Sequence, residues 1–249
     1  MPNTMLASHK TPLHYAPISL CEGEQGSGKS VYVVSEAVDA TFANVTSIKL
    51  VNGQVFRCST VYDSAGFPII GQVKVHLSTK DIIVKCPAGS CVTADDIRIF
   101  ANFHFYGIRA VYLTMAQILE YLNDGVITYG YLYLDEHYMG GNAREGTSVI
   151  VKAITKLSNQ MRKKHIFLTY ITPNARQIDW IERSAVRKHI LCQNYNEETR
   201  IVTYTIQETG THGIRTKSFY AGTYFPYYWT DEQISMGDNA IGKAIQAAM

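Results

Sequence analysis

The chain has 249 residues, of which 46% are hydrophobic and 18% are charged, and its 23 Lys and Arg nearly balance its 21 Asp and Glu. This composition excludes an intrinsically disordered protein, and the near-neutral charge argues against a protein that coats nucleic acid with its whole surface. No run of about 18 apolar residues is present, so we expect no transmembrane helix. The first residues lack the pattern of a secretory signal, and an odd number of cysteines, five, favours reduced thiols inside a cell.

The N-terminal half predicts a strand, a helix and then a β-rich insertion. A polar lead-in covers about residues 1–15, and the apolar run 17–21 predicts a buried strand. Valines at helical spacing predict a helix over 30–41, directly after a glycine-rich segment. Between about 44 and 92, short β-like runs alternate with turn signals, which predicts an insertion of β-structure. The β-like runs are 48–50, 73–77 and 82–84.

Strand and helix alternate again from residue 97 onward. Residues 97–103 predict a strand, and Thr114 with Gln117 has the form of a capping box that opens a helix ending near 123–125. Apolar strands that alternate with helices predict a mostly parallel sheet covered by helices. The remaining predicted elements are a strand over 131–136, a helix over 150–161, a strand over 165–171, a short helix over 178–184, a strand over 189–193 and a C-terminal β-hairpin from 200–207 and 217–225.

Residues 23–30 match the phosphate-binding pattern G-x-x-x-x-G-K-[ST]. Glycines allow successive backbone N–H groups to turn toward phosphate oxygens; Lys29 would reach the β- and γ-phosphates, and the Ser30 hydroxyl would bind Mg²⁺. Because the motif follows a predicted strand and precedes a predicted helix, it predicts a site for ATP with Mg²⁺. The predicted nucleotide-binding residues are Gly23, Glu24, Gln25, Gly26, Ser27, Gly28, Lys29 and Ser30.

Two carboxylates end the apolar strand that reaches residue 136. Asp135 would lie at the sheet edge where ligands of open α/β sheets bind, and there it could hold Mg²⁺ through water. Glu136 would polarise the attacking water as a general base, which favours hydrolysis over phosphoryl transfer to a small molecule. Thr172, with Asn174 behind it, is the candidate sensor of the γ-phosphate at the tip of the neighbouring strand. A strand-ending Thr-Pro turn explains Thr172 equally well.

These motifs resemble those of the FtsK–HerA superfamily of P-loop ATPases that pump DNA. Within it, the chain is most similar to the genome-packaging ATPases of membrane-containing icosahedral viruses. The resemblance runs from about Pro17 to Glu232, interrupted by the insertion, and includes the basic run 162–165 and the segment 172–179. The family often has Thr-Gln at the strand tip, whereas Pro173 follows the threonine here. The resemblance implies a RecA-like fold, a homo-oligomeric ring, double-stranded DNA as substrate, a capsid vertex or portal protein as partner, and a place in the host cell cytoplasm or the virion.

The resemblance also implies an arginine that acts on the nucleotide of a neighbouring subunit. Arg162 stands ten residues before Thr172, as the corresponding arginine of relatives does. A guanidinium that stabilises charge on the γ-phosphoryl oxygens is worth about 10³–10⁵ in rate. Arg144 and Arg183 are plausible alternatives, and a solvated surface position would explain any of the three.

Two groups of basic residues could contact DNA. Lys152, Lys156, Lys163 and Lys164 border the apolar stripe of one predicted helix, although an ordinary solvated helix face explains them as well. Arg57, Lys74, Lys80 and Lys85 lie in the β-rich insertion. Cys86 and Cys91 have the spacing of half a zinc site, but no second pair of ligands stands at a matching distance.

The sequence therefore predicts one RecA-like α/β P-loop ATPase domain over 1–249, with a β-rich insertion and a C-terminal β-hairpin. The predicted metal ligands are Ser30 and Asp135, and the predicted catalytic residues are Glu136, Lys29, Arg162 and Thr172. The predicted function is ATP-driven translocation of double-stranded DNA into a preformed viral capsid. The alternatives are an assembly and export ATPase of a filamentous phage, which usually has a membrane span, and an ATP-binding regulatory switch that moves no DNA.

Overall fold

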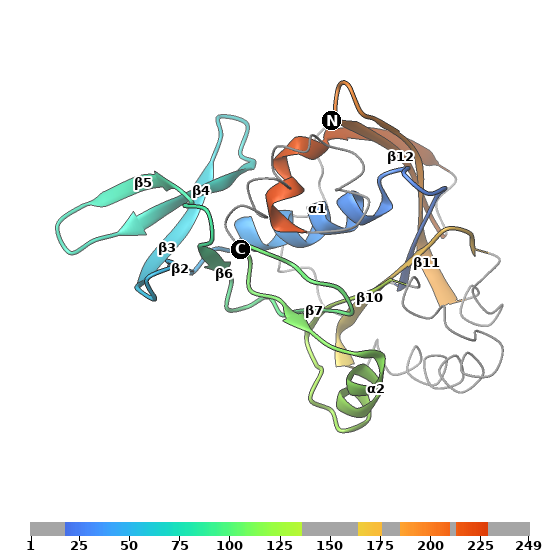
Figure 1. The fold of residues 1–249 in the computed structure, drawn as a ribbon, viewed down its shortest axis with the longest axis horizontal. Helices are drawn as coiled ribbons and strands as arrows, with labels where there is room; N and C mark the ends of the chain where they lie inside the picture. Colours follow the sequence, from blue (N-terminus) through green and yellow to red (C-terminus); the bar gives the residue numbers. More distant parts are fainter. Residues whose placement is uncertain (1–17, 136–163, 176–184, 210–212, 229–249) are drawn as a thin grey trace, which may run out of the picture.

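The computed structural model describes residues 18–135, 164–175, 185–209 and 213–228, which form an α/β fold with two sheets (Figure 1). One sheet has eight strands in the order β13-β12-β11-β1-β10-β9-β7-β8, and the other has five in the order β5-β4-β3-β2-β6. The strands and helices are β1 Ile18–Glu22, α1 Lys29–Phe42, β2 Ser47–Lys49, β3 Val55–Tyr62, β4 Pro68–His76, β5 Asp81–Lys85, β6 Cys91–Thr93, β7 Ile99–Ala101, β8 Val111–Tyr112, α2 Met115–Asn123, β9 Gly130–Asp135, β10 Ile166–Thr172, β11 Val186–Asn196, β12 Ile201–Glu208 and β13 Ile214–Tyr220.

The eight-stranded sheet is mostly parallel, as the sequence predicts. Strands β8, β7, β9, β10, β1 and β11 pair in parallel, and β12 and β13 add an antiparallel hairpin at one edge. The central strands are apolar on both faces because helices and loops cover both of them. The hairpin is confirmed, but its predicted second strand is too long: β13 ends at Tyr220, and short 3₁₀ turns follow at Ala221–Thr223 and Phe225–Tyr227. Pro226 lies in the second turn, where its missing N–H is tolerated.

Helix α1 is buried between the two sheets (Figure 1). Ten of its 14 residues are buried, and they lie on all sides of the helix. A helix that is buried on all sides is expected where both of its flanks are covered. The apolar residues of α1 belong to one continuous core that reaches from the eight-stranded sheet to Val73 and Val75 of β4. The predicted helix over 30–41 is therefore confirmed, and α1 is the common core element of both sheets.

The two carboxylates of α1 each have a polar partner, as burial requires. Glu36 accepts a hydrogen bond of 2.9 Å from the Tyr32 hydroxyl and pairs with the buried ammonium of Lys188 on β11. Asp39 accepts a hydrogen bond of 2.8 Å from the Tyr224 hydroxyl. Burial raises the pKa of Asp39 to about 7, and the hydrogen bond from Tyr224 only partly opposes that rise. Asp39 therefore favours its neutral form much more strongly than a solvated carboxyl does.

The five-stranded sheet, over residues 47–93, confirms the predicted β-rich insertion but contains more strands than the apolar runs indicate. The three predicted runs correspond to β2, β4 and β5. Strand β3 is missing from the prediction because its sequence has neither a continuous apolar run nor a strict alternation of polar and apolar residues, and only Cys58 and Val61 of that strand are buried. Strand β6 has three residues, which is too short to give a periodic pattern.

Helix α2 packs on the face of the eight-stranded sheet that lies opposite α1, where it buries Ile118 and Leu122. Its capping box is present: the Thr114 side chain accepts from Gln117 N at 3.3 Å, and the Gln117 side chain accepts from Thr114 N at 2.9 Å. The predicted helices over 150–161 and 178–184 lie outside the described residues. In the part of the chain that the structure describes, no helix is long and apolar enough to cross a membrane.

Replacing Asp39 by asparagine should stabilise the protein at neutral and alkaline pH. The folded-state pKa of about 7 lies above the ordinary value of 3.8, so between these values the folded state holds a proton that the unfolded state has released. Stability therefore falls as pH rises through this window, and the loss is complete above pH 7. The asparagine amide would still accept the bond from Tyr224 and carries no charge, so Asp39→Asn should gain on the order of 1–3 kcal/mol at about pH 8 and little at about pH 4. Urea unfolding across pH measures this difference, and a gain that is independent of pH would contradict it.

Candidate functional site

The segment that matches the phosphate-binding pattern forms the loop between β1 and α1. Gly26 and Gly28 have φ angles of 77° and 91°, in the left-handed region that favours glycine. Gly28 is the N-cap of α1, and no side chain caps the helix there. The first N–H groups of α1 are thus available to an anion, and the helix dipole favours negative charge at the same end.

Two of the loop glycines are also required by close packing. A Cβ atom on Gly23 would lie 2.4 Å from the carbonyl oxygen of Cys192 and 2.5 Å from Ser27 Oγ. A Cβ atom on Gly28 would lie 2.8 Å from the Val202 side chain on β12. The loop is therefore held against β11 and β12, and its curvature is fixed by strands that lie far away in the sequence.

The polar side chains of the loop suit a phosphate group. Lys29 Nζ donates a hydrogen bond of 2.7 Å to the carbonyl oxygen of Glu24, which holds the ammonium across the loop. The Ser27 hydroxyl is buried and has no hydrogen-bond partner among the described residues. Glu24 and Gln25 are exposed, and Ser30 is half-buried at the first turn of α1. An orphaned hydroxyl, an adjacent ammonium and uncapped N–H groups together fit the oxygens of a polyphosphate.

Asp135 lies where the sequence predicts it, at the end of β9 after the buried residues Leu132, Tyr133 and Leu134. In register, Ile171 of β10 pairs with Asp135, and the next residue, Thr172, pairs with Glu22 of β1. The end of β9 and the end of β1 therefore reach the same edge of the sheet, one strand apart. Tyr131 and Tyr133 pack toward α1, and by alternation Asp135 lies on that side too.

Asn102 holds the backbone of Asp135, a contact that the sequence did not predict. Asn102 Nδ2 donates to the carbonyl oxygen of Asp135 at 2.8 Å, and the N–H of Asp135 donates to Asn102 Oδ1 at 2.8 Å. Asn102 is buried directly after β7, the strand next to β9 in the sheet. This two-point contact fixes the end of β9, and through it the position of the Asp135 carboxylate.

Thr172 lies at the tip of β10, but its hydroxyl is used within the turn that follows. Thr172 Oγ1 donates to the carbonyl oxygen of Asn174 at 3.1 Å and accepts from its N–H at 3.2 Å. The residue is fully buried on the face opposite α1, because Leu168 and Tyr170 of the same alternation belong to that core. A strand-ending turn accounts for these contacts, and the role of Thr172 as a sensor stays a prediction. Glu136, Arg144, Arg162 and Arg183 lie outside the described residues.

Glu22 is a second residue of this edge that the sequence did not reveal. Its Oε2 accepts a hydrogen bond of 2.6 Å from the N–H of Ala175, and its Oε1 lies 2.9 Å from His189 Nε2 in a close contact that is not an aligned hydrogen bond. Glu22, the last residue before the phosphate loop, thus contacts both the turn after β10 and strand β11. Only the parallel pairing of β1 with both strands brings these groups together.

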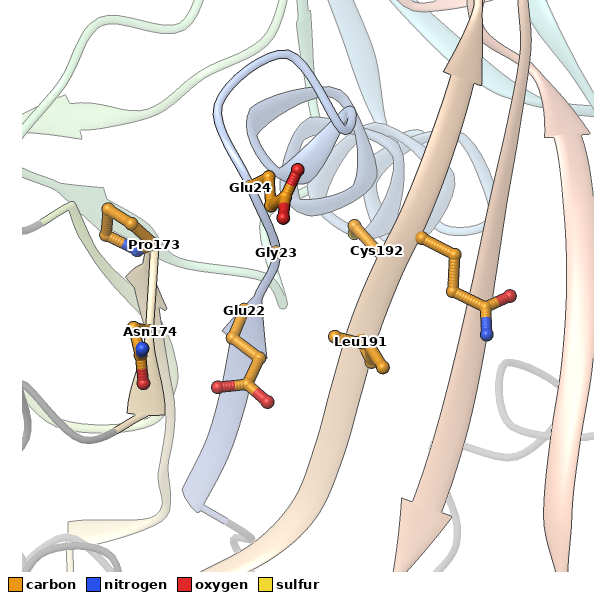
Figure 2. Close-up of a pocket in the computed structure, with 8 residues that line it drawn as sticks. Glu22, Gly23, Glu24, Pro173, Asn174, Leu191 and Cys192 are labelled. Atoms are coloured by element: carbon orange, nitrogen blue, oxygen red, sulfur yellow. The ribbon is translucent and has the colours of Figure 1, made fainter.

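A cavity of about 410 Å³ opens at this edge, beside the start of the phosphate loop. Its volume is within the range of small-molecule sites. Figure 2 shows Glu22 and Gly23 at the end of β1, with the turn after β10 on one side and β11 on the other. The lining residues are Glu22, Gly23, Glu24, Pro173, Asn174, Leu191, Cys192 and Gln193.

Cys86 and Cys91, which have the spacing of two zinc ligands, are not part of a cluster of metal ligands within the described residues. Burial raises the pKa of Cys86 to about 11 and raises the pKa of Cys91 as well. No cluster of three or more His, Cys, Asp or Glu side chains suited to a metal occurs in the described ranges.

Comparisons with known proteins find similarity only at the level of structure. No known protein family matches the sequence, and no curated protein is detectably similar to it. The N-terminal domain of the zonular occludens toxin from Neisseria meningitidis is 15% identical with a TM-score of 0.46, over 86% of this chain and 99% of that one. A KaiC-like protein from Pyrococcus horikoshii is 11% identical with a TM-score of 0.43, over 82% of this chain and 83% of that one.

A third similar structure is the monomer form of the pCW3 conjugation coupling protein TcpA with ATPγS. It is 10% identical with a TM-score of 0.43, over 89% of this chain and 63% of that one. All three TM-scores lie below 0.5. The assignment of a P-loop NTPase fold therefore rests on the strand order and on the glycine loop between β1 and α1.

Asn102→Ala should lower both stability and nucleotide turnover. It removes both hydrogen bonds to the Asp135 backbone, at a cost of about 1–3 kcal/mol. Asn44→Ala is the matched control, since Asn44 Nδ2 also donates to a backbone carbonyl at 2.8 Å, but at the far end of α1. Turnover per folded molecule should fall at least about tenfold for Asn102→Ala and stay near wild type for Asn44→Ala. Equal turnover of the two variants would show that Asn102 does not position the site.

Proposed function

We propose that this protein is an ATP-hydrolysing motor that translocates double-stranded DNA and packages a viral genome into a preformed capsid. The observation that carries the nucleotide part is the convergence of the glycine loop, Lys29 and the clamped Asp135 at one edge of a parallel sheet. The motor part rests on the resemblance of the motifs to DNA-pumping ATPases. Subunits would form a ring, with a capsid vertex or portal protein as a further partner.

The residues of this edge fit ATP with Mg²⁺. The N–H groups of the loop and Lys29 would hold the phosphates, while the Ser30 hydroxyl and Asp135 would hold the metal, Asp135 through its water shell. The bound Mg²⁺ would neutralise charge on the phosphate oxygens. Glu136, the next residue after Asp135, would accept the proton of the attacking water. The Asn102 contact matters here because it fixes the strand end that carries Asp135, the residue directly before Glu136 in the sequence.

The main test measures ATP turnover with and without double-stranded DNA over a range of protein concentrations. A DNA-moving ring should be stimulated by DNA, and its turnover per subunit should rise with concentration as rings assemble. Lys29→Ala should abolish turnover under all conditions, because it removes the charge that meets the β- and γ-phosphates. Turnover of Lys29→Ala within about tenfold of wild type, a loss below about 1.4 kcal/mol, would refute the nucleotide site. ATP turnover that does not change when DNA is added would favour a regulatory switch instead.

Arg162 should act on the nucleotide of a neighbouring subunit, and mixing two inactive variants tests this. Arg162→Ala keeps an intact phosphate loop, whereas Lys29→Ala keeps an intact Arg162. In mixed rings, an Arg162→Ala subunit can receive a working arginine from a Lys29→Ala neighbour, so activity should reappear.

Arg183→Ala serves as the control in the same mixing experiment, because Arg183 is the next candidate. Rescue of Arg183→Ala but not of Arg162→Ala would move the role to Arg183. Absence of rescue for both, in mixtures shown to co-assemble, would contradict shared sites and with them the ring mechanism.

A further inference from the structure

The five-stranded sheet carries a disproportionate share of the positive charge. Residues 47–93 contain five Lys and Arg and two Asp, so about a fifth of the chain has a net charge of +3, whereas the whole chain has +2. The remainder of the protein is therefore slightly acidic. A local excess of this kind is the electrostatic footprint of a surface that meets a polyanion.

The strand register places four of these cations on one face of the sheet, which we call the basic face: Lys49, Arg57, Lys74 and Lys85. Ser47 pairs with Arg57 between β2 and β3, Ser59 pairs with Lys74 between β3 and β4, and Gln72 pairs with Lys85 between β4 and β5. Directly paired residues point to the same side, as do residues two apart along a strand. Each of four adjacent strands thus contributes one cation to the same face.

The opposite face of the sheet is apolar and packs toward α1. Ile48, Cys58, Val73 and Val75 are buried there and belong to the core that contains α1. The basic face therefore points away from the core, and in Figure 1 the β4–β5 hairpin extends away from the eight-stranded sheet. A large ligand could lie along this face without contacting the nucleotide edge.

The charges of the basic face are not neutralised within the described part of the protein. Its one carboxylate, Asp81, is 2.9 Å from His76 Nδ1, and His76 Nε2 is 3.1 Å from Ser59 Oγ. No ion pair joins a carboxylate of the described residues to any of the four cations. Four like charges on adjacent strands repel one another, and a polyanion along the face would remove that repulsion.

We propose that the basic face binds the phosphate backbone of double-stranded DNA. Four strands span about 14 Å, and a duplex carries one charge per about 1.7 Å of its axis, so roughly eight phosphates pass over this width. Ser59 and Gln72 lie among the cations and are typical donors to phosphate oxygens. Val55 and Ile83 are the large apolar residues on this face that are clearly exposed, at 62% and 58%, and two side chains are too little apolar surface for insertion into a membrane. The proposal rests on the proposed DNA-moving function and adds the contact surface, which would be independent of DNA sequence.

The test compares duplex binding by wild type with that of two quadruple variants that lose the same charge. The first, Lys49→Gln/Arg57→Gln/Lys74→Gln/Lys85→Gln, removes the basic face. The second, Arg98→Gln/Arg187→Gln/Arg215→Gln/Lys217→Gln, removes cations that lie in the eight-stranded sheet or, for Arg98, directly before its strand β7. Fluorescence anisotropy of a labelled duplex of random sequence is measured over a range of salt concentrations. In the first variant, the slope of the logarithm of the binding constant against the logarithm of the salt concentration should become less steep by about 3–4, and binding should weaken at least about tenfold. The binding constant and the slope of the second variant should stay near those of wild type.

DNA-independent ATP turnover separates failure of this proposal from failure of the proposed function. Wild type that hydrolyses ATP but binds no duplex would overturn both the DNA function and the basic face. If wild type binds duplex and the first variant binds it as tightly, the basic face alone is overturned. The same holds if the affinity for duplex falls equally in both variants. Phosphatidylglycerol vesicles are the competing polyanion: tighter binding to vesicles than to duplex, lost in the first variant, would also overturn the proposal. Loss of duplex binding with unchanged basal turnover and thermal stability would support it.

Discussion

The burial of α1 between two sheets is the constraint on which the other features depend. Because the helix has almost no solvent-facing side, its carboxylates need internal partners, which Tyr32, Lys188 and Tyr224 provide. The same confinement fixes where the helix begins, and Gly28 is pressed against Val202 of β12 at that point. The loop that could hold phosphate is therefore positioned by packing on two sides, and its shape does not depend on the ligand alone.

Parallel strand order positions the carboxylates Asp135 and Glu22, just as packing positions the loop. β1, β10 and β9 are neighbours, so their C-terminal ends meet at one edge although β1 precedes the other two by more than a hundred residues in the chain. Side chains then lock the ends to one another: Asn102 binds the backbone of Asp135, and Glu22 binds the turn after Thr172. These bonds are local in space and remote in sequence. They make the edge a preorganised surface, which is what electrostatic catalysis of phosphate chemistry requires.

The sequence predicted the features that depend on neighbouring residues and missed those that depend on strand order. The glycine loop, α1, the Thr114–Gln117 capping box and the position of Asp135 follow from local pattern, and the structure has them. Asn102 and Glu22 carry no local signal, because their partners are defined only once β7 lies beside β9, and β1 beside β10 and β11. Strand β3 was missed for a related reason: one of its faces is polar, and its pairing with β4 decides its structure more than its own hydrophobicity does.

Strand β4 contributes side chains both to the core that contains α1 and to the basic face. Its Val73 and Val75 pack in the core that contains α1, while Lys74 between them lies on the basic face. Helix α1 is therefore in contact with β4, which lies a single layer of side chains away from the basic face. The insertion in this way provides the second flank that buries α1, and the outer side of that flank is the basic face.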